Sequence, residues 1–180
     1  GEFIEINGDS FDILKQSDMI NWNSKYKCMT FDDKDYDNIM YYTKDDQTNR
    51  IRSFLKSIGV VRYKINDDYS VDVTESVRIR IPIDNIPIKF DYIMGNFDIS
   101  NCGLSSLKGC PETIEGDFIC NRNNLINLKF GPKEVGGNYD VKLTGLKNLR
   151  GAPDWIKKNF NCSLNNITDL MGGPRIVDGS

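Results

Sequence analysis

The sequence contains no histidine among its 180 residues. This absence excludes Ser-His-Asp and Cys-His catalysis, together with the zinc sites that depend on histidine ligands. The chain has no apolar stretch of about 18 residues, so we expect no membrane-spanning helix and no membrane partner. No signal peptide is recognisable in it. A net charge of −3 offers no basic surface, which excludes nucleic acid as an expected partner.

Cysteine is scarce and odd in number, which argues against a disulfide framework. The chain has five cysteines, and Cys102, Cys120 and Cys162 occupy positions that we expect to face the interior or a turn. Small apolar filler in a reducing compartment is the simpler interpretation. It predicts a cytoplasmic protein.

One acidic run begins like a calcium-binding loop. Asp33, Asp35 and Asp37 alternate as the first ligands of such a loop do. Asn38 then stands where the sharp turn needs glycine, and Lys44 stands where the bidentate glutamate belongs. We therefore predict a solvated loop or helix start, with no metal and no cofactor.

Against these absences stands a pattern that recurs every 21 residues through the second half of the chain. Its first element is an apolar pair of the form L-x-x-L: Ile83/Ile86, Leu104/Leu107, Leu125/Leu128, Leu146/Leu149 and Ile167/Leu170. A second apolar column holds Ile93, Ile114, Val135, Ile156 and Val177. Further columns hold an aromatic residue (Phe97, Phe118, Tyr139, Phe160) and a proline (Pro111, Pro132, Pro153, Pro174). This period and spacing are typical of a leucine-rich-repeat solenoid.

Each repeat predicts one coil built around a short strand. In residues 118–120 the aromatic and the cysteine face the interior, and Ile119 faces out. Successive coils then place these strands side by side in a parallel sheet. One inward column can hydrogen-bond the turn and form a ladder: Cys102, Asn123, Thr144 and Asn165. The next column contains only glycine and asparagine, which predicts a left-handed turn at each member: Gly103, Asn124, Gly145 and Asn166.

The period is absent before about residue 70, and we divide the chain accordingly. Residues 1–74 are predicted to form an N-terminal α+β cap. It contains a helix over residues 46–57 that ends at Gly59, and a hairpin over residues 60–73. Earlier helices are predicted over residues 10–22 and 35–42.

Residues 75–180 are predicted to form the solenoid, with about five repeats. Val77 and Ile79 mark a degenerate first repeat with one residue of slippage. The predicted fold class is an α/β solenoid, a short right-handed leucine-rich-repeat coil with a parallel sheet and the N-terminal cap. The last repeat is incomplete, so either the parent chain continues beyond Ser180 or the last coil is left open to a partner.

Two strings of the repeat region carry a family resemblance. Gly-Cys-Pro-Glu-Thr-Ile-Glu-Gly-Asp-Phe-Ile-Cys-Asn-Arg-Asn-Asn-Leu at 109–125 and Gly-Pro-Lys-Glu-Val-Gly-Gly-Asn-Tyr at 131–139 closely resemble leucine-rich-repeat proteins of tailed bacteriophages. Residues 63–73 are similar to the segment that precedes the repeats in those proteins. The resemblance covers about residues 60–180, and it implies a viral origin and a binding role in the host cytoplasm. More distantly, the repeats resemble those of bacterial effectors, some of which carry a ubiquitin-ligase domain that has no room here.

The outward side of the short strands is the expected binding surface, because it lines the concave face of a curved solenoid. Its three columns hold Asn96, Asp117, Asn138 and Asn159; Asp98, Ile119, Asp140 and Asn161; and Ser100, Asn121, Lys142 and Ser163. The candidate binding residues are Asp98, Ser100, Asp117, Ile119, Asn121, Asp140, Lys142 and Asn161. The alternative is that these polar residues bind no partner and only keep the exposed face of the sheet hydrated.

The sequence thus favours a non-enzymatic viral module that docks a protein partner, such as a host defence or regulatory protein. One alternative is a structural or assembly component of the virion that forms homo-oligomers through the open last repeat. The other is a small enzyme whose active site lies in the N-terminal cap, with the acidic run and nearby tyrosines as candidate site residues.

Overall fold

The computed structural model describes residues 21–23, 28–30 and 46–179. The chain divides into two compact units, Gly1–Arg52 and Ser53–Ser180. In the first unit, β1 (Asn21–Asn23) pairs antiparallel with β2 (Cys28–Thr30). The helix predicted over residues 10–22 is therefore wrong at its C-terminal end, where asparagines with low helix propensity flank a tryptophan. The rest of that helix, the helix at 35–42 and the acidic run lie outside the described residues.

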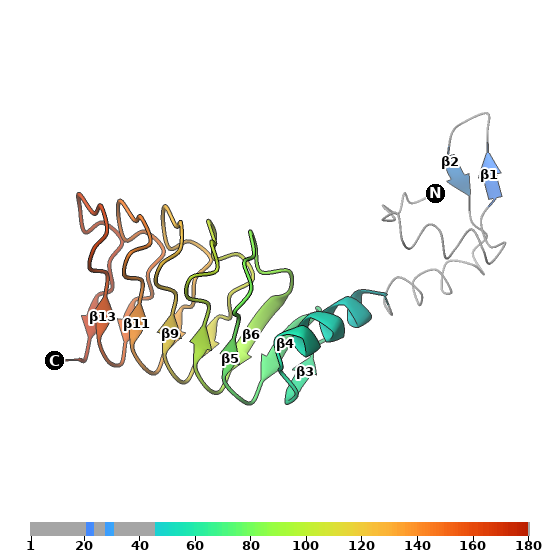
Figure 1. Ribbon diagram of the computed structural model, residues 1–180, viewed down its shortest axis with the longest axis horizontal. Helices are drawn as coiled ribbons and strands as arrows, with labels where there is room; N and C mark the ends of the chain where they lie inside the picture. Colours follow the sequence, from blue (N-terminus) through green and yellow to red (C-terminus); the bar gives the residue numbers. More distant parts are fainter. Residues whose placement is uncertain (1–20, 24–27, 31–45, 180) are drawn as a thin grey trace. The chain divides into compact units, whose positions relative to one another are not determined.

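The second unit is a β-solenoid of about five turns with parallel sheets and few helices, which confirms the predicted solenoid. Figure 1 shows its coils stacked in a row. The predicted strands form a five-stranded sheet: β5 (Val77–Arg78), β7 (Phe97–Asp98), β9 (Phe118–Ile119), β11 (Tyr139–Asp140) and β13 (Phe160–Asn161). Every pairing in it is parallel, as predicted.

A second sheet follows the other apolar column and was not predicted. Its strands are β3 (Tyr63–Ile65), β4 (Ser70–Val73), β6 (Lys89–Ile93), β8 (Thr113–Ile114), β10 (Glu134–Val135), β12 (Trp155–Ile156) and β14 (Ile176–Val177). Within this sheet only β3 and β4 pair antiparallel, and they form the predicted hairpin. Each of the later strands carries a single recurring apolar residue, such as Ile114 or Val135, and so lacks the apolar alternation that marks a strand in a sequence.

The helix at residues 46–57 ends as predicted. Gly59 has a φ of 76°, and its N–H donates to the carbonyl of Lys56 at 3.1 Å. The N–H of Val60 donates to the carbonyl of Leu55 at 2.9 Å, which completes a Schellman motif. Leu55 and Val60 are both buried, so the apolar contact that usually accompanies this motif is available.

The core runs along the solenoid axis as stacked columns. Phe97, Phe118 and Tyr139 are fully buried and form a column in which the first two rings are stacked and the third is tilted. Successive centroids lie 6.3 Å and 4.7 Å apart along this column. The hydroxyl of Tyr139 is buried without a hydrogen-bond partner, and burial raises the pKa of this phenol well above its usual value. The leucines of the L-x-x-L pairs in the middle coils are also buried.

The predicted asparagine ladder is confirmed. Oδ1 of Asn123 accepts hydrogen bonds from the N–H groups of Cys102 (3.2 Å) and Leu104 (3.0 Å) in the preceding coil. Its Nδ2 donates to the carbonyls of Ile99 and Cys120, both at 2.9 Å. One side chain therefore satisfies four backbone groups that the turn would otherwise leave buried and unpaired.

The predicted left-handed column is confirmed at its glycines and wrong at its asparagines. Positive φ occurs at Gly103 and Gly145, whereas Asn124 and Asn166 do not adopt it. The turns after β7, β9, β11 and β13 each have a further left-handed residue two positions earlier: Asn101, Arg122, Leu143 and Leu164, with φ of 56°, 57°, 56° and 54°. A hydrogen bond between coils holds this residue, as where the Arg122 N–H donates to the carbonyl of Lys142 at 3.0 Å. This tertiary bond explains why leucine and arginine are accepted there.

The first coil is one residue shorter than the others. Val77 pairs with Phe97, a step of 20 residues, whereas Phe97 pairs with Phe118, a step of 21. The predicted slippage at this repeat is therefore confirmed. No residue between Arg80 and Pro82 has a positive φ, so the shorter coil lacks the left-handed turn.

Candidate protein-interaction face

The outward side of the five-stranded sheet carries the predicted binding residues, and we call it the five-strand face. It comprises the three outward columns in register: Ser76, Asn96, Asp117, Asn138 and Asn159; Arg78, Asp98, Ile119, Asp140 and Asn161; and Arg80, Ser100, Asn121, Lys142 and Ser163. Strand alternation sends the aromatic column inward and the middle column outward, because neighbouring side chains point to opposite faces.

The first column is a hydrogen-bond ladder between coils. Ser76 Oγ accepts from the N–H of Asn96 at 3.0 Å, and Asn96 Oδ1 accepts from the N–H of Asp117 at 2.8 Å. Asp117 Oδ1 then accepts from the N–H of Asn138 at 2.6 Å, and Asn138 Oδ1 accepts from the N–H of Asn159 at 3.2 Å. One carboxylate oxygen of Asp117 is therefore held by the hydrogen bonds of this ladder.

The middle and third columns are linked within each coil. Oδ1 of Asp98 accepts from the N–H of Ser100 at 3.1 Å, and Oδ1 of Asp140 accepts from the N–H of Lys142 at 3.1 Å. Oδ1 of Asn161 accepts from the N–H of Ser163 at 3.2 Å in the same way. An acidic or amide side chain that bonds the backbone two residues ahead is the signature of an Asx turn. These bonds fix the direction of each side chain at the end of its strand.

Ile119 interrupts this series, because it has no oxygen to accept such a bond. In its coil, Asn121 instead donates from Nδ2 to Oδ2 of Asp140 at 2.9 Å. The structure thus brings Asn121, Asp140 and Lys142 together. Ile119 lies half-buried between the coils of Asp98 and Asp140, as the apolar residue of a polar surface.

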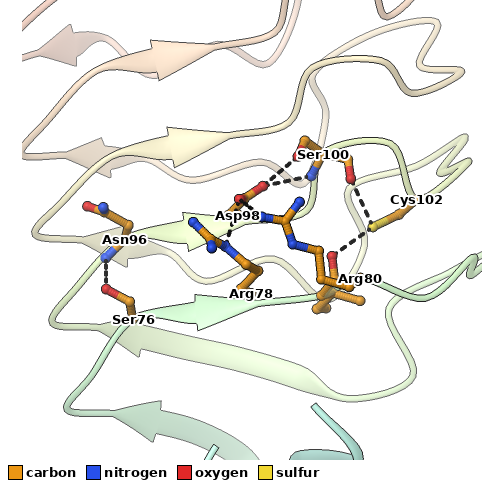
Figure 2. Close-up of polar contacts among 8 residues, drawn as sticks. Ser76, Arg78, Arg80, Asn96, Asp98, Ser100 and Cys102 are labelled. Carbon is orange, nitrogen blue, oxygen red and sulfur yellow. Dashed lines mark hydrogen bonds and ion pairs between the residues drawn. The ribbon is translucent and has the colours of Figure 1, made fainter. Parts of the chain in front are cut away.

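Asp98 differs from the other candidates because only 6% of it is exposed. Its Oδ2 lies 3.1 Å from Nε of Arg78 and 3.5 Å from a terminal nitrogen of Arg80 (Figure 2). These two arginines belong to the five-strand face, and they were not among the binding residues predicted from the 21-residue repeat. The signal was present, because the one-residue slippage recognised at Val77 and Ile79 aligns the intervening arginine with Asp98.

The buried thiols do not add a reactive site to this face. Burial raises the pKa of the Cys102 thiol, and the nearby Asp98 carboxylate raises it further. Burial likewise raises the pKa values of Cys110 and Cys120. Because the thiolate is the nucleophile, these cysteines are inert in the folded protein. Among residues 46–179 and the two short strands before them, no cluster of potential metal ligands occurs.

A scan against protein-family models found no match for the chain, and searches of curated proteins and of solved structures found none either. The functional assignment therefore rests on the residues of the face itself. Within the described part of the chain, no helix is both long and apolar enough to cross a membrane.

Proposed function

We propose that this chain is a non-enzymatic interaction module that docks a protein partner on the five-strand face. The observation that carries the proposal is the network of hydrogen bonds that holds the polar side chains of this face in fixed directions. A surface whose side chains are already ordered loses less conformational entropy on binding, so its contacts contribute more to affinity. Ile119 supplies an apolar contact within this polar frame.

The resemblance to bacteriophage proteins extends the proposal to the kind of partner. On that basis the chain is a viral protein that acts in the host cytoplasm, and its partner is a host defence or regulatory protein. Neither nucleic acid nor membrane is part of this proposal.

We also propose that the coils are of the leucine-rich-repeat type, right-handed, with an N-terminal α+β cap. The buried L-x-x-L leucines and the asparagine ladder support the repeat type. The position of the β3–β4 hairpin at one end of the seven-stranded sheet supports a capping role, because an edge coil needs a cover.

The test compares two isoleucine substitutions in a pull-down from bacterial lysate, read by mass spectrometry. Ile119→Arg places a charge within the five-strand face, whereas Ile126→Arg makes the same change at a site that is 65% exposed and lies outside that face. A host protein that the wild type and Ile126→Arg retain, and that Ile119→Arg loses, supports docking on this face. Equal retention by both variants would refute it.

The last coil favours a second function, self-association in a virion or assembly component. Leu170 is 75% exposed and Val177 is 40% exposed, although their equivalents Leu128 and Ile156 are fully buried. Strands β13 and β14 are also the end strands of their sheets. The test is sedimentation velocity over a hundredfold range of concentration, with Leu170→Asp as the dissociating variant. A monomer throughout would exclude this function.

The enzyme alternative remains a prediction, because most of the residues proposed for it lie outside the described ones. It predicts that deletion of residues 1–45 abolishes a measurable hydrolase activity of the full chain. Failure to detect such an activity in the full chain would remove this alternative.

A further inference from the structure

The first coil places two guanidinium groups on the five-strand face. Arg78 and Arg80 are separated by one residue, so both point outward while Val77 and Ile79 point into the core, where they are 1% and 0% exposed. Figure 2 shows both guanidinium groups gathered around Asp98 of the next coil. The arginine side chains remain 62% and 60% exposed.

Asp98 holds these arginines without neutralising them. Its Oδ1 accepts hydrogen bonds from the N–H and the hydroxyl of Ser100, at 3.1 Å and 2.7 Å. Its Oδ2 is shared by the two guanidinium groups. One negative charge therefore faces two positive charges, and within the described residues no second carboxylate lies within ion-pair distance of either arginine.

The remaining donors of this pair are arranged for an anion. A guanidinium carries five N–H donors in a planar fork, and each arginine uses only one nitrogen toward Asp98. Because the Asp98 side chain is 8% exposed and fixed by Ser100, the arginines lose little freedom when a second oxyanion arrives. The fork geometry matches a carboxylate in a bidentate manner.

An apolar residue, Ile119, lies near Arg78 and Arg80, and this combination favours a protein segment as the ligand. Arg78, Asp98 and Ile119 occupy one column in successive strands. Strands in a sheet are about 4.8 Å apart, so Ile119 lies about 10 Å from the strand of Arg78. We propose that Arg78 and Arg80 bind an aspartate or glutamate side chain of the protein partner, whose neighbouring apolar residue rests on Ile119. This inference rests on the proposed function, and it adds the chemistry of the partner.

The experiment is an NMR titration of the 15N-labelled full chain with a capped peptide, Gly-Glu-Ala-Leu-Gly. The matched control peptide carries glutamine in place of glutamate, and inorganic phosphate is the third ligand. We expect the glutamate peptide to shift the Nε–H resonances of Arg78 and Arg80 with a dissociation constant on the order of 1 mM. The glutamine peptide should leave them unchanged.

Two double variants distinguish binding that needs the guanidinium geometry from binding that needs only positive charge. Arg78→Lys with Arg80→Lys keeps the charge and the pairing with Asp98 but removes the fork. Binding to this variant is followed at the backbone amide resonances of Ile79 and Asp98, and we expect it to weaken about tenfold relative to the wild type read at the same amides. Lys147→Gln with Lys158→Gln removes two exposed charges elsewhere and should leave binding within about twofold of the wild type. The amide spectrum of each variant shows whether it is folded.

Three outcomes overturn the inference: no shift with the glutamate peptide, equal shifts with both peptides, or tighter binding of phosphate at the same resonances. The last outcome would identify a phosphate ligand instead of a partner carboxylate. The proposed function fails separately, because a successful titration combined with undiminished capture by Ile119→Arg would leave an anion site on a face that does not dock the partner.

Discussion

Replacing Asn123 by alanine should destabilise the solenoid far more than replacing its neighbour Asn124. Asn123 is 5% exposed, and its Oδ1 accepts from the N–H groups of Cys102 and Leu104. Alanine leaves both donors buried without a partner, and each such group costs about 1–3 kcal/mol. Entry of a water molecule would recover part of this loss, so we expect the free energy of unfolding to fall by about 3 kcal/mol.

The control residue lies next in the chain and has no such role. Asn124 is exposed, and its side chain makes one hydrogen bond within the described residues, a 3.4 Å bond to the carbonyl of Gly103. We expect Asn124→Ala to change the free energy of unfolding by less than about 0.5 kcal/mol. Asn123→Thr should fall between the two, because the equivalent Thr144 hydroxyl donates to the carbonyl of Val141 at 2.8 Å but lacks the second arm of an asparagine.

The assay is urea unfolding followed by far-ultraviolet circular dichroism, with an unchanged m-value as the condition for comparing free energies. Asn165→Ala provides an internal comparison, since Asn165 makes similar bonds but is only half-buried in the last coil, where water can replace them. It should cost less than Asn123→Ala. A loss below about 1 kcal/mol for Asn123→Ala, or an equal loss at Asn124, would refute the ladder as a source of stability.

Three further predictions follow from the packing. Tyr139→Phe should leave the free energy of unfolding unchanged or raise it by about 1 kcal/mol in urea titrations, because the lost hydroxyl is buried and unpaired; a loss above about 1 kcal/mol would indicate a hidden partner. In native thiol labelling mapped by mass spectrometry, half-buried Cys162 should react much faster than fully buried Cys120, and equal rates would contradict the stacking order. Hydrogen bonds from Lys89 and Ser70 lower the pKa of Asp68 in the folded protein below its ordinary value of 3.8. The ionised carboxylate therefore stabilises the fold above pH 3.8, and this contribution is lost as the pH falls through the lower pKa of the folded state. The urea midpoint of the wild type should therefore fall more steeply below pH 4 than that of Asp68→Asn, and parallel profiles would exclude this contribution.

The columns of the solenoid could be predicted because every coil must bury the same edge, so the same residue types return at a fixed step. The ladder at Asn123 was predictable for the same reason, since only a side chain with both a donor and an acceptor serves that position well. The seven-stranded sheet was not predicted, because each of its later strands carries one recurring apolar residue, whereas the five-stranded sheet carries two that alternate, as at Phe118 and Cys120.

The left-handed backbone was predicted correctly at Gly103 and Gly145, but the second left-handed residue of each turn was missed because its conformation does not follow local preference. Glycine and asparagine mark the position where left-handed backbone is cheapest, yet Leu143 and Leu164 adopt it two residues earlier. The N–H groups of Asn101, Arg122 and Leu143 donate to the next coil, as in the bond from Leu143 to Ser163, and Leu164 in the last coil repeats the same backbone conformation. The arginines beside Asp98 were missed because the shortened first coil moves them out of the 21-residue register.

That shortened coil shows where this architecture accepts a change in chain length. A residue is missing from its turn, yet β5 still pairs with β7 and β4 still pairs with β6. Alterations confined to the turn after the five-stranded sheet thus leave both sheets intact, whereas the same alteration inside a strand would reverse which side chains face the interior. Evolution can therefore lengthen or decorate these turns without rebuilding the coil, and the turn between Arg80 and Ile83 is the natural place to insert an affinity tag or a foreign epitope.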